Sequence, residues 1–296
     1  MEKLNKYWLE IIGILIAIIC LYYFVPILFN LFNELYVNSK TTECHGIYGN
    51  FGSFVGGVFG TIIGFVTLFF VYITYTSQRK ELKIQKELIS QQQFESTFFN
   101  MLNVHRELKN SLIYSTDDID DTKLKGIETI NTSIKKIKTY YERINLLKEG
   151  KKLHINDFSD EYEKKIKDEL DKNATELKII NLAYQHYFNN DQYLISHYCR
   201  NVYHILKYIR GNEENKTLGK DLKKYQNYAD IFQSQLSVDE QFLLFYNFIH
   251  FNDETKGIYS TINLVNHYKF LENLGSNNLL NKDLHNNKKF YSFDIK

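Results

Sequence analysis

The chain has 296 residues, with 36 Lys or Arg against 35 Asp or Glu, so no global excess of charge points to nucleic acid or to an acidic partner. Three cysteines exclude a disulfide-stapled secreted scaffold, and one proline with 14 glycines argues against a collagen-like or turn-rich all-β chain. The mean hydropathy of −0.35 is typical of a soluble protein, but the apolar residues are concentrated in two segments near the N-terminus.

The first apolar segment, Ile11–Phe29, is long enough to cross a membrane. No charged residue occurs from Ile11 to Asn33, and a helix needs roughly 20 apolar residues to cross the hydrocarbon core. A cleaved signal peptide is the competing interpretation. The length of the run, the lack of a small-x-small cleavage pattern and the second apolar segment soon after it disfavour that interpretation. We therefore predict a transmembrane span over about residues 9–31.

The second apolar segment, Phe51–Tyr75, combines transmembrane length with a regular spacing of glycine. Glycine recurs at every fourth position, at Gly52, Gly56, Gly60 and Gly64. On a helix these residues form one smooth groove, which lets another helix backbone approach closely in lipid. The groove is expected to pack either on the first span of the same chain or on a second copy of the chain.

The basic residues around the two segments predict their orientation. Two lysines precede the first span and four basic residues follow the second: Lys3 and Lys6, then Arg79, Lys80, Lys83 and Lys86. The short connection between the spans holds one lysine, Lys40, against two glutamates. The positive-inside rule then places both termini in the cytoplasm, in a multi-pass topology.

Beyond the second span, the sequence predicts only helices. Residues 77–93 lack a helix breaker and are expected to continue the span as a polar stalk. A largely apolar face follows, formed by Phe94, Phe98, Met101, Leu102, His105, Leu108 and Leu112. Between Ile127 and Leu147, isoleucines recur three and four residues apart, as in a coiled-coil seam that either packs within a bundle or pairs with another chain.

Further helices are predicted toward the C-terminus. They cover Ala174–Phe188, Asp191–Ile209, Asp221–Gln235, Val238–Phe251 and Tyr259–Leu274, with Ser237 and Glu240 as a capping box before the fourth. The predicted fold class is all-α, an N-terminal two-helix transmembrane hairpin followed by a cytoplasmic helical bundle. The hairpin covers residues 1–76, the stalk 77–93, the helical domain 94–275, and a tail expected to be mobile covers 276–296.

A stripe of polar side chains marks the predicted helix Asp191–Ile209. His197, Arg200, Asn201 and His204 are spaced at i, i+3, i+4 and i+7, so they share one helix face. One interpretation is a buried polar network that joins helices. The other is a ribonuclease site, because Arg200–His204 resembles the Arg–His motif of HEPN-type nucleases. That resemblance implies that Arg200 holds a phosphate and His204 acts in acid–base chemistry, with His197 and Asn201 in support.

The segment RNVYH (Arg200–His204) resembles the Arg–His motif of HEPN-type nucleases. It differs in having three residues between the Arg and the His, where the usual motif has four to six. His197 and His204 are two helical turns apart, too far for an i,i+4 metal chelate, and the sequence predicts no metal and no cofactor.

Several segments, in order along the chain, resemble the phage abortive infection proteins of the AbiC type. They are the glycine-rich span, then QQFESTFFNMLNVHRELKNS, SHYCRNVYHILKYI, QSQLSVDEQFLLFYN and YKFLENL. Besides the polar stripe, the positions that carry the resemblance include Glu95, Phe98, Phe99, Gln235, Ser237 and Glu240. Cys199 stands where we expect an aromatic residue in this family.

This resemblance implies a bacterial anti-phage defence protein, anchored in the inner membrane, whose cytoplasmic helical domain senses infection or executes growth arrest. Two alternatives stay open: a HEPN-like membrane-tethered ribonuclease that uses Arg200 and His204, and a non-enzymatic effector that permeabilises the membrane. The expected partners are the lipid bilayer and a second copy of the chain, with a phage component or RNA as a further possibility.

Overall fold

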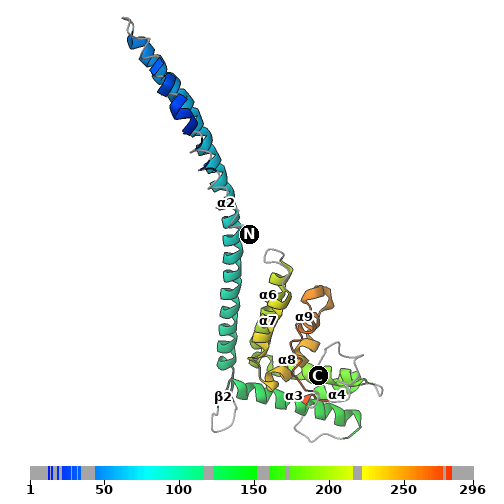
Figure 1. Cartoon of the computed structure of the whole chain (residues 1–296). Coiled ribbons are helices and arrows are strands. Elements are labelled where there is room, and N and C mark those ends of the chain that lie inside the picture. Colours follow the sequence, from blue (N-terminus) through cyan, green and yellow to red (C-terminus); the bar gives the residue numbers. More distant parts are fainter. Residues whose placement is uncertain are drawn as a thin grey trace. The chain divides into compact units, whose positions relative to one another are not determined.

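The computed structural model describes residues 44–115, 123–151, 160–170, 174–215, 222–275 and 278–281, together with a discontinuous set between residues 13 and 34. The chain divides into two compact units, Met1–Lys83 and Ile84–Lys296, and the division falls inside the segment predicted as a stalk. The long helix α2, Cys44–Ser111, contributes its first part to one unit and its last part to the other (Figure 1). The acidic residues 117–121 and nearly all of the predicted tail lie outside the described residues.

One helix among the described residues is long and apolar enough to cross a membrane, and its apolar part belongs to the N-terminal unit. This helix is Gly52–Ser111 within α2, and its apolar part is not buried by protein. A shorter apolar helix covers Tyr22–Leu31, and its Phe24 ring meets the Phe59 ring edge to face at 5.4 Å. The second predicted span is therefore an apolar helix of sufficient length, whereas the two-span hairpin stays a prediction.

The hydroxyl groups of the apolar helix are satisfied within the helix itself. Ser53, Thr61 and Thr67 each donate a hydrogen bond to the carbonyl four residues earlier, at 3.0, 2.7 and 2.8 Å. Such bonds remove the cost of an unsatisfied hydroxyl in an apolar environment. The four regularly spaced glycines meet no described atom within 4 Å of where a Cβ would lie, so their groove is not covered by the described residues.

In the C-terminal unit, the last turns of α2 bury the predicted face. Phe94, Phe98, Leu102 and His105 are all buried, and the Phe94 ring stacks on Tyr208 with ring centroids 5.4 Å apart. Two short antiparallel strands then follow, β1 (Ile113–Ser115) and β2 (Lys123–Lys125), paired with Tyr114 opposite Leu124. Strands of three residues are too short to show a recognisable alternation of apolar and polar residues in the sequence. The all-α fold class is confirmed apart from the two short strands β1 and β2.

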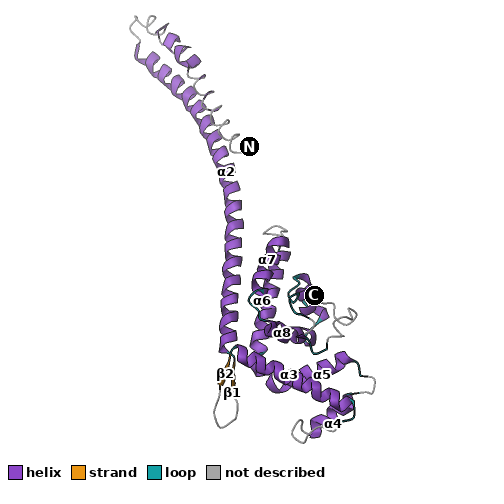
Figure 2. Cartoon of the chain, turned by 60° about the horizontal axis from the view of Figure 1, so that its bottom comes forward, coloured by secondary structure: helices purple, strands orange, loops and turns teal. Residues whose placement is uncertain are grey.

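The isoleucine-rich segment forms α3, Ile127–Lys148. The helix ends in a Schellman motif, because Gly150 has φ 73° and the amides of Gly150 and Lys151 donate to the carbonyls of Leu147 and Leu146. Ile144 and Leu147 form a small core with side chains of α4 (Asp160–Glu169) and α5 (Glu176–Asp191). Figure 2 shows these two helices beside α3. The predicted seam is therefore largely buried within the chain, at Ile130, Ile134, Ile137, Ile144 and Leu147.

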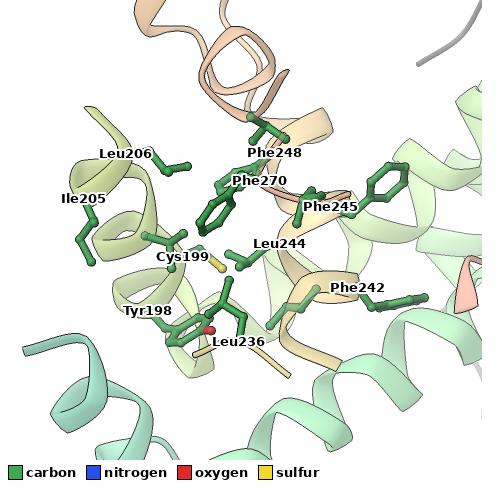
Figure 3. Close-up of a cluster of buried hydrophobic side chains, with 14 of the residues drawn as sticks. Tyr198, Cys199, Ile205, Leu206, Leu236, Phe242, Leu244, Phe245, Phe248 and Phe270 are labelled. Atoms are coloured by element: carbon green, nitrogen blue, oxygen red, sulfur yellow. The ribbon is translucent and has the colours of Figure 1, made fainter. Parts of the chain in front are cut away.

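The remaining helices build the main core. They are α6 (Ser196–Glu214), α7 (Leu222–Gln233), α8 (Val238–His250) and α9 (Thr261–His267), with 3-10 turns η1 (Gln192–Leu194) before α6 and η3 (Glu254–Tyr259) before α9. Figure 3 shows side chains of α6 and α8 that meet in this core, among them Cys199 and Leu244. The predicted capping box is confirmed, since Ser237 and Glu240 exchange both of its hydrogen bonds.

The predicted helix Tyr259–Leu274 is wrong in extent. Helix α9 begins after Ser260, whose hydroxyl accepts a hydrogen bond from the Asn263 amide, and it ends at His267. Lys269 then has φ 50°, which is incompatible with a continuing right-handed helix. The apolar residues Phe270, Leu271 and Leu274 are buried from a series of turns instead.

Candidate functional site

A pocket of about 310 Å³ opens beside α6 in the C-terminal unit. Its walls come from the ends of α5 and α8, from one face of α6, and from η3 and the start of α9. The lining residues are Phe188, Ser196, Cys199, Arg200, Tyr203, His204, Asn247, Phe248, Phe251, Lys256 and Thr261. Four of these are aromatic and three can carry a positive charge, whereas none of the described lining residues is acidic.

The structure divides the four polar residues of the predicted stripe. Arg200 and His204 line the pocket together, one helical turn apart on α6. His197 is exposed but lies outside the pocket lining. Asn201 is half-buried on another side of the helix, beside the ring of His105 from α2. The residues of the stripe therefore lie in different environments: Arg200 and His204 line the pocket, and Asn201 lies at the contact between α6 and α2.

Arg200 has no hydrogen bond or ion pair with any residue that the structure describes. Ten residues further along α6, Arg210 shows the opposite situation. Its guanidinium contacts Glu213 at 3.0 Å and Glu214 at 2.8 Å, and it also meets the His267 ring. Arg210 is thus fixed in a structural cluster, while the Arg200 guanidinium keeps its donors available to a ligand in the pocket.

The electrostatics of the pocket favour a neutral imidazole at His204. Partial burial, together with the nearby Lys207 and Arg200 charges, lowers the pKa of His204 below its ordinary value. The ring is therefore uncharged at neutral pH and has a free nitrogen lone pair that can accept a proton. Among the described residues no hydrogen bond holds His204, so a ligand can approach either ring nitrogen.

Lys256 brings a second cation to the pocket from η3. Its ammonium group lies 5.8 Å from the centre of the Tyr203 ring and 3.6 Å from Asp253, and the side chain is half exposed. The Tyr203 hydroxyl donates to the Tyr259 carbonyl at 3.1 Å, which fixes that ring in the wall. Lys256 is thus placed by contacts on both sides, and its salt bridge with Asp253 at 3.6 Å leaves it half exposed toward the pocket.

The floor and the aromatic wall are rigid. Asn247 donates to the Tyr184 hydroxyl at 2.7 Å, and the Thr261 hydroxyl donates to the Phe248 carbonyl at 2.8 Å. Phe251, which is 41% exposed, meets the Phe188 ring edge to face at 4.8 Å. Polar side chains at the floor already have partners within the protein, so the wall and the cations are the groups left to recognise a ligand.

A buried polar network lies on the other side of α6. His105 is 2% exposed and lies between the rings of Tyr198 and Phe232, and neither of its nitrogens has a hydrogen-bond partner among the described residues. Burial lowers the pKa of His105 to about 4. The Tyr198 hydroxyl donates to Glu240 at 2.7 Å, and Lys109 lies 3.3 Å from the same carboxylate. This network joins α2, α6 and α8, and Asn201 lies beside it on α6.

The residues that carried the family resemblance outside the stripe are mostly structural. Glu95 accepts a hydrogen bond from the Tyr228 hydroxyl at 2.7 Å, and Phe98 is fully buried. Phe99 is 49% exposed, and Gln235 is half-buried near the end of α7. None of these lines the pocket. Lys256 was missed by sequence reasoning, because nothing local distinguishes it from other exposed lysines.

The arrangement can bind an anion and supply one neutral imidazole, His204, that can accept a proton. A cofactor-binding motif is not evident in the sequence. Among the described residues no group of three His, Cys, Asp or Glu side chains is placed to hold a metal ion. Binding of an anionic ligand with an aromatic part is therefore the chemistry for which the pocket has the most complete set of groups.

The pocket lies almost entirely in a segment of the chain that matches a known protein family. Residues 190–279 match the family model described as "Putative phage abortive infection protein", and this segment holds ten of the eleven pocket residues. No curated protein matches the chain, and no solved structure does. The resemblance to phage abortive infection proteins is confirmed over residues 190–279.

Proposed function

We propose that the chain is a membrane-anchored bacterial anti-phage defence protein whose helical unit, from Ile84 onward, executes growth arrest through the pocket on α6. The observation that carries the proposal is the family match over residues 190–279, which coincides with the pocket. The apolar, unburied part of α2 supports the membrane anchor. The edge-to-face contact of Phe24 with Phe59 supports a hairpin of two spans, and the basic residues at its ends support cytoplasmic termini.

A phage challenge tests the proposed function. Bacteria that express the full chain are compared with bacteria that express Arg200→Ala and with an empty-vector strain. We expect the full chain to reduce plaque formation and infected cells to stop growing before new phage are released. Arg106→Ala is the matched control, because Arg106 is an exposed arginine of α2 outside the pocket. Equal plaque counts in all strains over a broad phage panel would refute the defence role.

The membrane anchor needs a separate measurement. We expect the full chain to remain in the membrane pellet after a carbonate wash and to be released by detergent, because the apolar surface of α2 is not buried by protein and lipid would cover it. Recovery of the chain in the supernatant without detergent would contradict the anchor. A reporter fused to either terminus, active only in the cytoplasm, would test the orientation.

A HEPN-like ribonuclease is the second candidate function. The specific observation in its favour is that Arg200 and His204 line one pocket and are both unpaired among the described residues. A phosphate on Arg200 would bring an adjacent ribose hydroxyl within reach of the neutral His204 ring, which could take up the proton of that hydroxyl. Cellular RNA that stays intact during arrest, in the wild type as in His204→Ala, would exclude it.

A further inference from the structure

The most informative feature of the pocket is the combination of an unpaired arginine and a nearby lysine with a partly exposed aromatic wall. Arg200 and Lys256 reach the pocket from two different elements, α6 and η3, and Arg200 has no acidic partner among the described residues. An arginine left unpaired beside a concave surface retains up to five N–H donors in a planar fork, which is the geometry suited to phosphate oxygens.

The aromatic wall specifies the other half of the ligand. Phe251 exposes 41% of its surface beside Phe188, and Tyr203 lies with Lys256 over its ring. A partly exposed phenylalanine that lines a pocket gains free energy when a planar apolar group covers it, and nucleic-acid bases stack on such rings whatever their sequence. A simple anion would leave this wall uncovered, and an aliphatic anion would gain little from its ring faces.

The size of the pocket limits the ligand to a small one. A volume of about 310 Å³ is at the lower end of the range for small-molecule sites, roughly 300–1,000 Å³. It accommodates one nucleotide unit and is too small for a dinucleotide or a folded RNA element. A longer strand could therefore place only one of its nucleotides in the pocket.

We propose that this pocket binds a single nucleotide unit, with its phosphate on Arg200 and Lys256 and its base against Phe251 and Phe188. The unit comes either from a free mononucleotide or from one position of a single-stranded RNA. The inference rests on the proposed function in one respect: both take this pocket as the functional site of the protein. It names the ligand class for that site and holds whether or not His204 performs catalysis.

The test is calorimetric titration of the full-length chain in detergent at low salt, with four probes. They are adenosine monophosphate, adenosine, inorganic phosphate and a single-stranded RNA of four adenosines. We expect the monophosphate or the RNA to bind at least ten-fold more tightly than either adenosine or phosphate, because only these two probes carry both a phosphate and a base. Preference for the monophosphate identifies a free nucleotide as the source, and preference for the RNA identifies a strand.

Matched variants assign the binding to this pocket. Arg200→Ala should weaken binding about 10- to 100-fold, because it removes charge-assisted hydrogen bonds to phosphate. Phe251→Ala should weaken it roughly 5- to 100-fold through lost stacking. The controls are Arg106→Ala and Phe99→Ala, which remove an exposed arginine and a 49% exposed phenylalanine outside the pocket. Helix content and thermal melting confirm that each variant is folded.

Failure of this inference is distinguishable from failure of the proposed function. A folded chain that binds none of the four probes at millimolar concentration, or that binds them equally well in the pocket variants and the controls, overturns the nucleotide site. If that chain still protects cells against phage, the defence role stands without it. If the chain binds the monophosphate through Arg200 and Phe251 but protects against no phage, the nucleotide site is supported and the proposed defence function is refuted.

Discussion

Replacement of His105 by leucine should remove part of the acid sensitivity of the C-terminal unit. The imidazole is buried between Tyr198 and Phe232, and burial lowers its pKa from about 6.5 to about 4, with Glu240 opposing and Lys109 reinforcing the shift. Leucine has a similar volume and no polar atoms, so it fits an environment in which the two ring nitrogens have no partner among the described residues.

The sign and size of the effect follow from the two pKa values. Above pH 6.5 the ring is neutral in the folded and the unfolded chain, so the stabilising effect of the neutral form is fully present. As the pH falls from 6.5 toward 4, the unfolded chain takes up a proton that the folded chain does not, and stability is lost. The shift of about 2.5 units corresponds to roughly 3 kcal/mol in total, of which about 2 kcal/mol is lost between pH 7 and pH 5.

The assay is urea unfolding of the full chain in detergent at pH 7 and pH 5, followed by loss of helical signal. The wild type should lose more stability than His105→Leu over this interval, by about 2 kcal/mol. His197→Leu is the control, because that histidine is exposed on the same unit. The burial argument fails if His105→Leu loses as much stability as the wild type.

Three further predictions concern stability and association. Ser237→Ala should lower the free energy of unfolding by about 1 kcal/mol in urea titration, since it removes half of the capping box of α8, and no change would contradict the cap. Phe98→Ala should cost about 3–5 kcal/mol because the ring is fully buried, whereas the exposed Phe99→Ala should stay within about 1 kcal/mol in the same titration. Gly60→Leu should fill the glycine groove without strain inside its own unit, since no described atom lies near its Cβ position. If that groove packs on another helix in lipid, crosslinking between chains or between spans should fall, and unchanged crosslinking would refute the packing role.

The elements with strong local signals were predictable from the sequence. Helix α3 has isoleucine at helical spacing and a glycine at its left-handed terminus, and both signals act within a few residues. The same holds for the capping box at Ser237 and for the buried face of α2 at Phe94 and Phe98. In these cases local preference and tertiary packing agree.

The remaining features depend on contacts between residues distant in sequence. The spacing of Phe270 and Leu274 in the sequence suits a helix. In the structure both side chains are buried in the core, but the chain after Lys269 forms turns. The candidate site was half predictable: Arg200 and His204 could be recognised by their spacing, whereas Lys256 joins them only because η3 folds back toward α6. The sequence could not separate Asn201 from Arg200, since His105, the residue beside Asn201, comes from α2, almost a hundred residues earlier.

Cys199 gives the pocket a chemical reporter. The residue lines the pocket and is only 3% exposed, and burial raises the pKa of its thiol, so the reactive thiolate form is rare. In a chain whose other two cysteines are replaced by serine, the rate of alkylation at this sulfur would record how often it becomes accessible to solvent. A molecule seated above it would slow that rate further, which provides a label-based occupancy measurement in living cells without any knowledge of the reaction that the protein performs.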